Sequence, residues 1–528
     1  MAFFLVTFFI SLTFVIFILY LIAKILGGKF WYFFKSFLGS FREALNINPD
    51  VRKFIERYPR LSDFVYQRLR RNRFFGLPLT LFSLAFLYVA LLFFGVINDL
   101  LTSNVLAAAD LRIENLFYAW RTLPAVKVFL WLTFLGEKSM IVVFALMISG
   151  ILWLLKKNWQ ILIMWFIIAG SALSVWLTKM FFDRPRPINA VYLETSASFP
   201  SAHATLAVVF CGFVVFLLLS YLKKKKYKLL SLLSGLAVIL VIGFSRIYLG
   251  VHYFSDVWAG YLLGLLWLII GMALTQWKTF KTLIITKKEP LTTRKKSLIA
   301  LIIVLAFGIY FISAWRYRPT LYLTSTVMPE DLLATDVVNV FDEHDIPKYT
   351  ETLFGNPQEP LSFIVIAKND EVFLNAFRQS GWTLADGLNL KNAAEMLQTA
   401  VMNKQYLTAP VTPSFWNSSV HNFGFQKATD LQTVRQRHHA RFWKTDIKTK
   451  KGDSIYVGSA SLDTGLKWFV THRIDPVIDN ERNVLFTDLS QNNHLKLTEL
   501  IQFVPPVLGK NFTGDQFFSD GQAYVIKF

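Results

Sequence analysis

The chain has 528 residues, of which 54% are hydrophobic and 16% aromatic, and its mean hydropathy is +0.43. Soluble proteins rarely reach this apolar content, and several apolar runs are long enough to cross a bilayer. The single cysteine, Cys211, lies in one of these runs and excludes a scaffold of intramolecular disulfides.

The net charge of +20 is spread unevenly along the chain. Residues 1–319 carry 36 Lys and Arg against 12 Asp and Glu, whereas residues 320–528 carry 19 against 23. The cations of the first part flank apolar runs, which is typical of membrane-topology charge. We therefore expect a membrane, and no nucleic acid, as the partner of this region.

Residues 1–75 contain an apolar run near residues 2–26 and then a segment rich in Arg and Lys. The run lacks a basic start and a small-residue cleavage site, so we expect an uncleaved membrane span. The basic segment, residues 28–75, is interpreted as a cytoplasmic helical segment held near the inner leaflet. Seven further runs of spanning length follow, near residues 76–97, 134–155, 159–178, 203–222, 229–249, 256–275 and 297–315.

Basic residues between these runs set the expected orientation, because Lys and Arg gather on the cytoplasmic side of membrane proteins. Lys156, Lys157 and the Lys-rich segments 223–228 and 278–296 are therefore expected in the cytoplasm. Alternation of the spans then places residues 98–133 and the whole region after the last run outside. In a bacterial inner membrane, that side is the periplasm.

Residues 98–133 contain short apolar groups broken by charged residues. This mixture indicates an amphipathic stretch on the outer side, between two spans. Its charged residues Asp110, Arg112 and Glu114 are interpreted as surface charges.

Three short stretches near the outer ends of the expected spans carry charged residues in a regular order. In one of them His252 and Asp256, four positions apart, can share a face of a helical turn. There the carboxylate can fix the imidazole tautomer and leave the other ring nitrogen free to attack. Such a pair alone is more often a satisfied polar pair, but two more stretches accompany it. The three stretches are residues 179–187, 200–203 and 245–256.

In order and spacing, these stretches resemble the signature of the type 2 phosphatidic acid phosphatase superfamily. That signature is a Lys, six residues and Arg-Pro; then Pro-Ser-Gly-His; then Ser-Arg, five residues, His, three residues and Asp. Ala202 departs from it, because it stands where the family has glycine. The alanine adds a methyl group and keeps the backbone N–H donor.

The resemblance implies a two-step hydrolysis of a lipid phosphate. His252 would attack phosphorus and form a phosphohistidine, with Asp256 orienting its ring. His203 would protonate the leaving oxygen and later activate water. The resemblance implies no metal and no other cofactor.

The other matched residues would bind the phosphate. A terminal phosphate carries about two negative charges, so several cationic side chains can bind it. The planar guanidinium group of Arg can donate two parallel hydrogen bonds to its oxygens. A serine directly before an apolar helix also suits an anion, because the first backbone N–H groups of the helix are free. Lys179 and Arg186 have an alternative interpretation as snorkelling residues at a helix end. The phosphate-binding set is Lys179, Arg186, Ser201, Ala202 and Arg246.

Residues 276–319 are predicted to form a basic linker and the last span, and residues 320–528 a soluble periplasmic α+β domain. The part around residues 437–443, 456–458 and 472–475 resembles the LssY-type C-terminal domain, for which the resemblance supplies no catalytic role. His438, His439 and His472 are either metal or phosphate ligands or, as is more usual, polar strand residues. We expect strands at residues 361–367, 441–448, 454–460 and 467–472, and helices at 390–404 and 478–489.

The expected fold is therefore an all-α polytopic membrane domain followed by a soluble α+β domain. The membrane domain has a six-helix lipid-phosphatase core over residues 76–275, with extra flanking spans on both sides. The expected function is an integral membrane lipid phosphatase with undecaprenyl diphosphate as the first substrate. Phosphatidic acid, phosphatidylglycerol phosphate and lipid A phosphates are alternative substrates. A non-enzymatic envelope protein that handles lipids or binds partners is the alternative from another class.

Overall fold

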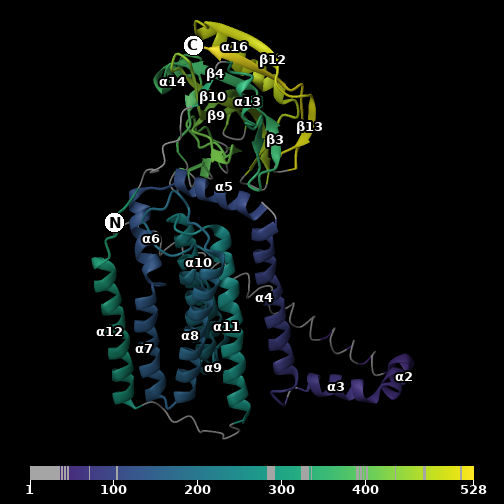
Figure 1. Ribbon diagram of the computed structural model, residues 1–528, viewed down its shortest axis with the longest axis vertical. Coiled ribbons are helices and arrows are strands. Elements are labelled where there is room, and N and C mark those ends of the chain that lie inside the picture. The colour runs from purple at the N-terminus through teal and green to yellow at the C-terminus, as the bar shows by residue number, and fades with distance from the viewer. Residues whose placement is uncertain are drawn as a thin grey trace. The chain divides into compact units, whose positions relative to one another are not determined.

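The computed structural model describes residues 47–528 and three positions between 36 and 43. Exceptions are residues 71, 103–104, 282–291, 323–331, 335, 434–435, 468–470, 512–513 and scattered positions between 388 and 403. The chain divides into two compact units (Figure 1). Unit 1 comprises Met1–Thr102 and Thr122–Leu323, and unit 2 comprises Ser103–Arg121 and Thr324–Phe528. The span predicted near residues 2–26 lies outside the described residues.

Unit 1 is built from helices. Six of those described are long and apolar enough to cross a membrane, namely α4, α8, α9, α10, α11 and α12. Helices α6 and α7, bent by 46° at a short break, pass the same test together. The helices are α2 (Pro49–Arg57), α3 (Pro59–Leu69), α4 (Leu77–Thr102), α6 (Leu123–Phe134), α7 (Lys138–Leu154), α8 (Asn158–Phe182), α9 (Ala202–Tyr221), α10 (Lys225–Tyr248), α11 (Phe254–Lys281) and α12 (Thr293–Arg316).

The break between α6 and α7 corrects one predicted span. Helix α6 begins at Leu123, ahead of the predicted start at residue 134, and its apolar residues are mostly buried. At the break, a Cβ on Gly136 would lie 2.7 Å from Cγ2 of Ile242 and 3.3 Å from the ring of His203. Glycine therefore lets α9 and α10 approach the break closely, and the following residue, Glu137, comes to face α9.

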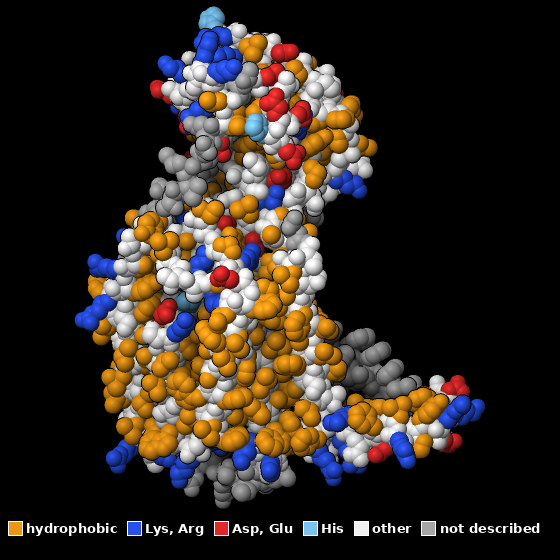
Figure 2. Space-filling view, in the orientation of Figure 1, with side chains coloured by type: hydrophobic (Ala, Val, Ile, Leu, Met, Phe, Trp, Pro, Cys, Tyr) orange, Lys and Arg blue, Asp and Glu red, His pale blue; other side chains and the backbone are white. Residues whose placement is uncertain are grey.

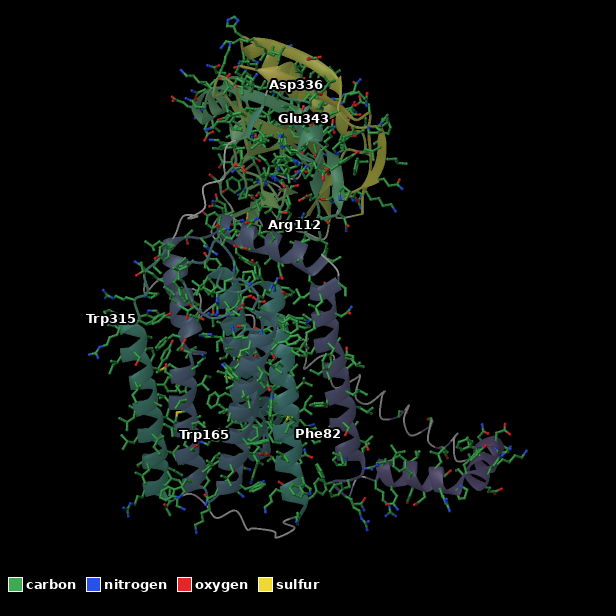
Figure 3. The ribbon with its side chains drawn as sticks, in the orientation of Figure 1. Phe82, Arg112, Trp165, Trp315, Asp336 and Glu343 are labelled. Carbon is green, nitrogen blue, oxygen red and sulfur yellow. The ribbon has the colours of Figure 1, made fainter. Side chains whose placement is uncertain are left out.

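Helices α9 and α11 form the centre of unit 1. In the most apolar segment of each of these helices 56% of the residues are buried, against 11% in α4 and 17% in α12. At their contact, a Cβ on Gly260 would lie 2.7 Å from the carbonyl oxygen of Ser201. Glycine therefore lets the backbone of α11 approach the start of α9 closely. Trp315, which is 61% exposed, lies at the upper end of α12 in Figure 3, as aromatic residues do at membrane interfaces.

Charged side chains mark the two ends of unit 1 differently. Figure 2 shows a band of hydrophobic side chains with Lys and Arg gathered at its lower end, where α7, α9 and α11 end. The loops there contain Lys156 and Lys157 between α7 and α8, and residues 222–224 between α9 and α10. The loop at 183–201 lies at the other end of the same helices (Figure 1). Which end faces the periplasm stays a prediction.

Unit 2 is an α+β domain. Among its described residues, a nine-stranded sheet has the order β12-β15-β4-β10-β9-β8-β5, with β1 beside β9 and β11 beside β10. Smaller sheets are β3-β2-β6-β7 and β13-β14. The helices are α5 (Val105–Ala119), α13 (Val340–Glu343), α14 (Asp370–Gln379) and α16 (Ile478–Asn492). The strands are β1 (Leu332–Ala334), β2 (Tyr349–Glu351), β3 (Pro357–Pro360), β4 (Phe363–Ala367), β5 (Thr383–Leu384), β6 (Phe415–Trp416), β7 (Ser419–Val420), β8 (Phe423–Thr433), β9 (Gln436–Thr449), β10 (Ser454–Lys467), β11 (Thr471–Ile474), β12 (Leu497–Gln502), β13 (Val507–Lys510), β14 (Gln516–Ser519) and β15 (Gln522–Lys527).

The main sheet is covered on both faces, and the sequence predicted much of it. Strand β4 is buried at every position, which is why its sequence is a continuous apolar run. The strands predicted at 361–367, 441–448 and 454–460 and the helix at 478–489 are confirmed, but three of these elements are longer than predicted: β9 begins earlier, and β10 and α16 end later. The single strand predicted at 467–472 is wrong, because β10 ends at Lys467 and a separate strand, β11, begins at Thr471 and pairs antiparallel with β10. The helix predicted at 390–404 lies largely outside the described residues.

Helix α5 corrects the prediction for residues 98–133. Asp110, Arg112 and Glu114 were predicted as surface charges, but unit 2 buries them to 1%, 5% and 4% exposure. A terminal nitrogen of Arg112 (labelled in Figure 3) lies 2.8 Å from the Glu351 carboxylate, and the other donates to a carbonyl of its own helix. The ion pair compensates the buried guanidinium, which hydropathy alone could not indicate.

Candidate active site

The residues predicted for the site meet at one end of unit 1. Lys179 lies in the last turn of α8, and Arg246 in the last turn of α10. Ser201 directly precedes α9, whose first residues are Ala202 and His203. His252 lies in the turn between α10 and α11, and Asp256 in the first turn of α11. Arg186 comes from the loop at 183–201.

Local sequence explains why the chain turns at these points. Asp183 ends α8 in a left-handed conformation, with φ at 39°, and two prolines follow within the next four residues. Gly250, with φ at 62°, allows the tight turn after α10. The loop is then held by backbone hydrogen bonds from Val191 to Leu249 at 2.9 Å and from Ser201 to Asp256 at 3.0 Å.

His252 is held between an acid and a cation. Its Nδ1 lies 3.4 Å from Oδ2 of Asp256, and its Nε2 lies 3.4 Å from a terminal nitrogen of Arg186. Asp256 in turn accepts hydrogen bonds from the backbone N–H of Tyr253 at 2.9 Å and from Arg184 at 2.7 Å. Burial, followed by the charges of Arg246 and Arg186, lowers the pKa of His252 well below its usual value. The ring is therefore neutral at pH 7, with Nε2 directed toward the cations.

A carboxylate bridges the two arginines of the site. One oxygen of Glu194 contacts Arg246, and the other lies 2.7 Å from Arg186. Arg246 also donates to Thr133 at 2.9 Å and to the Tyr192 hydroxyl at 2.6 Å. Burial would raise the pKa of Glu194, but the guanidinium groups of Arg246 and Arg186 outweigh it and hold that pKa far below its usual value. The two guanidinium groups thus form a binding place for an anion, and the carboxylate of Glu194 occupies it.

Lys179, Ser201 and Ala202 surround the same region. The ammonium group of Lys179 donates to the carbonyl of Ala197. The hydroxyl of Ser201 is buried and has no hydrogen-bond partner among the described residues. It stands at the N-terminus of a long helix, where backbone N–H groups are free for an anion.

His203 faces an acid from a distant part of the chain. Its Nε2 lies 3.1 Å from the carboxylate of Glu137, at the break between α6 and α7. Such a carboxylate can orient the imidazole and stabilise its protonated form.

Sequence reasoning missed three charged residues that contact the predicted site residues. Arg184 lies inside the first motif and was given no role, yet it contacts Asp256. Glu194 and Glu137 lie outside the motifs. The one signal for Glu137 was an acid in an otherwise apolar stretch, and Glu194 is the one acid between residues 184 and 203.

Comparison with known proteins follows the division into two units. Residues 140–280 match the PAP2 superfamily, and residues 343–523 match the LssY C-terminus. Phosphatidylglycerophosphatase B of Bacillus subtilis (strain 168) is 30% identical over 178 residues, which are 33% of this chain and 87% of that protein. The chain belongs to the PAP2 superfamily. The prediction of a PAP2 lipid phosphatase with an LssY-type C-terminal domain is thereby confirmed.

Two solved structures also match the PAP2 part. One is the PAP2 type phosphatidylglycerolphosphate phosphatase from Bacillus subtilis, with 27% identity and a TM-score of 0.34, covering 36% of this chain and 96% of that one. The other is Aquifex aeolicus LpxE, with 26% identity and a TM-score of 0.26, covering 31% of this chain and 94% of that one. The PAP2 match at 140–280 contains every residue of the predicted site.

Proposed function

We propose that this PAP2 protein removes the terminal phosphate of undecaprenyl diphosphate on the periplasmic side of the bacterial inner membrane. The observation that carries the proposal is the Glu194 carboxylate held between Arg246 and Arg186, the arginine that lies 3.4 Å from Nε2 of His252. A carboxylate has one negative charge and a terminal phosphate about two, so a phosphate gains more from the same guanidinium groups. It would displace Glu194 and meet the histidine.

In the first step Nε2 of His252 attacks phosphorus as the bond to the leaving oxygen breaks. His203 gives its proton to that oxygen, while Asp256 keeps Nδ1–H of His252 in place. Arg186, Arg246 and Lys179 stabilise the charge on the equatorial oxygens, together with Ser201 and the first N–H groups of α9, which begins at Ala202.

In the second step water attacks the phosphohistidine, and His203 takes a proton from that water. Inorganic phosphate leaves and His252 is restored. Glu137 contributes by stabilising the protonated form of His203, which is present before the first step and after the second.

The position of the site near the ends of the membrane-spanning helices favours a lipid substrate. Lys179, Arg246 and Asp256 each lie within a turn of a helix end, which is the depth of lipid headgroups. A polyprenyl diphosphate at that depth keeps its tail in the bilayer. Phosphatidylglycerol phosphate is the second candidate, favoured by the name of the Bacillus subtilis relative.

Phosphate release by the purified full-length protein tests the proposal. The panel is undecaprenyl diphosphate, phosphatidylglycerol phosphate and phosphatidic acid, and we expect the first to have the highest kcat/KM. A preference for another lipid would replace the substrate and leave the enzyme class intact. His252→Ala should lose activity by roughly 10⁴-fold or more, and phosphate trapped in alkali should lie on His252. No release from any of the lipids would overturn the phosphatase itself.

A further inference from the structure

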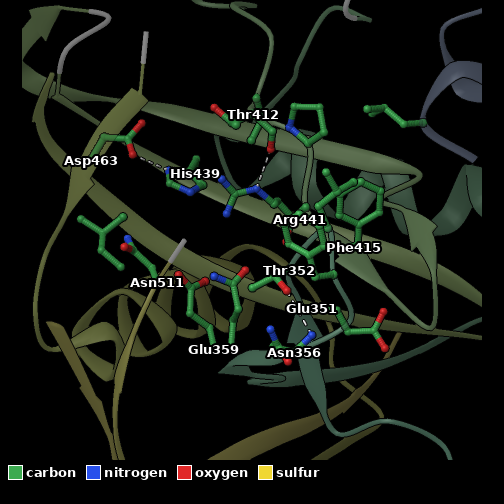
Figure 4. Close-up of a pocket in the computed structure, with 18 of the residues that line it drawn as sticks. Glu351, Thr352, Asn356, Glu359, Thr412, Phe415, His439, Arg441, Asp463 and Asn511 are labelled. Atoms are coloured by element: carbon green, nitrogen blue, oxygen red, sulfur yellow. Dashed lines mark hydrogen bonds and ion pairs between the residues drawn. The ribbon is translucent and has the colours of Figure 1, made fainter. Parts of the chain in front are cut away.

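Unit 2 contains a cavity of about 560 Å³ that the phosphatase site does not use. It lies between α5, the small sheet with β2, β3 and β6, and one face of β9 (Figure 4). This volume is within the range of small-molecule sites in proteins. All of its lining residues belong to unit 2.

Strand β9 supplies the polar side of the cavity. Arg437, His439 and Arg441 alternate along it and so share one face. Arg437 is already satisfied, because it lies 3.2 Å from Asp463, donates to Gln426 at 2.6 Å and reaches two backbone carbonyls. Its role is therefore to hold the wall of the cavity.

Arg441 and His439 each have hydrogen-bonding groups that make no hydrogen bond within the described residues. Nε of Arg441 donates to the carbonyl of Thr412 at 3.0 Å, and its terminal nitrogens have no hydrogen-bond partner within the described part of the chain. His439 is 2% exposed, and its Nδ1 lies 3.1 Å from an Asp463 oxygen, although neither ring nitrogen makes a hydrogen bond within the described residues. Burial lowers the pKa of His439 to about 4 although Asp463 opposes this, so the ring is neutral at pH 7. A neutral ring that keeps its proton on Nδ1, the nitrogen nearer the Asp463 carboxylate, has Nε2 as an acceptor.

Two further polar groups line the same space. The side-chain nitrogen of Gln358 is buried and has no partner among the described residues. Burial raises the pKa of Glu359, against the attraction of Arg441, and no ion pair between the two is formed. The cavity therefore offers one guanidinium fork for an oxyanion and acceptors for neighbouring hydroxyl groups.

Apolar side chains also line the cavity, beside further polar residues. Leu116 and Trp120 come from α5, and Phe415 from β6. Phe354, also in the lining, is 55% exposed, so covering it would remove apolar surface from water. If the anionic headgroup of a lipid bound to Arg441, its hydrocarbon chain would contact these apolar residues.

We propose that this cavity binds an anionic glycerolipid, with its phosphodiester on Arg441, a headgroup hydroxyl on Nε2 of His439 and an acyl chain along Phe354. A phosphodiester carries a single negative charge, which matches a single available guanidinium group. It is also not a substrate for a phosphatase of terminal phosphates, so this site is independent of the catalytic one.

Calorimetric titration of the full-length protein in phosphatidylcholine nanodiscs tests the proposal, with dihexanoyl phosphatidylglycerol as the probe. Dihexanoyl phosphatidylcholine has the same tails without net charge, and glycerol 3-phosphate has a head without tails. We expect saturable binding of the first and at least tenfold weaker binding of the other two. Equal binding of all three, or no binding of the first, would overturn the proposal.

Two variants place the binding in this cavity. Arg441→Gln should weaken binding by about tenfold or more, since it removes a charge-assisted contact. Phe354→Ala should weaken it several-fold, and its exposed position keeps the fold intact if Arg441→Gln unfolds. The matched controls are Arg378→Gln on the exposed face of α14 and Phe518→Ala on β14, which is 44% exposed outside the cavity. Wild-type affinity in Phe354→Ala would refute the site.

Discussion

Glu194 occupies the position that we assign to the substrate's phosphate, and this makes its charge directly testable. In Glu194→Gln the shape is kept and the ionic contacts to Arg186 and Arg246 become neutral. Because a charge-assisted contact exceeds a neutral one by about 1 kcal/mol or more, we expect the inhibition constant of vanadate to fall about five- to tenfold. Vanadate is suitable because it adopts the five-coordinate geometry of in-line transfer. A rise in that constant would show that Glu194 helps to bind the anion.

Arg184 acts through Asp256 and is therefore a positioning residue. Its guanidinium lies 2.7 Å from Asp256 and over the ring of Tyr253, with 4.3 Å to the ring centroid. Arg184→Ala leaves a buried carboxylate short of a donor, so we expect kcat to fall by about 10- to 100-fold while KM stays nearly unchanged. Arg184→Lys should recover part of kcat because it restores the charge. Equal effects on kcat and KM, with no recovery in the lysine variant, would count against this role.

At the scale of elements, α5 depends on the buried pair between Arg112 and Glu351. Removing one partner of such a pair leaves an uncompensated charge, and Arg112→Ala is expected to destabilise unit 2 by about 3–5 kcal/mol. Thermal unfolding of the full-length protein and limited proteolysis of unit 2 measure this. The double variant Arg112→Met with Glu351→Leu should lose less, because no charge remains buried. Arg378→Ala on the surface of the same unit is the control, and a loss as small as in that control would refute the pair's importance.

The sequence predicted the parts of the fold that repeat a pattern along the chain. Apolar runs gave the spans after residue 76, and motif spacing gave the residues that meet around His252. Contacts between distant segments left no such pattern, so Glu137 beside His203 and Glu194 between the arginines were missed. Arg112 was misjudged for the same reason, because a charge looks exposed until its buried partner is known. The start of α6 was missed because this helix is short and its apolar run contains Pro124 and Lys127.

For the whole molecule, the orientation in the membrane follows from the basic loops. The loops around Lys156 and residues 222–224 lie at the end of unit 1 away from the loop at 183–201. Moving such charges across a bilayer costs about 2.5–3.5 kcal/mol each, so these loops should stay in the cytoplasm. An alkaline-phosphatase fusion after Phe528 should then be active, and a cytoplasmic reporter at the same point should be silent. The reverse result would place the phosphatase site on the cytoplasmic side.

The glycine contact between α9 and α11 has a consequence for substrate choice. A side chain at Gly260 would meet the carbonyl oxygen of Ser201, so the helices that carry His203 and Asp256 are packed in close contact at this point. We therefore expect the spacing of these groups to be the same for a small lipid and a large one. Adaptation to headgroups of different size is then expected from residues 183–201, which lie between the helices and not within them.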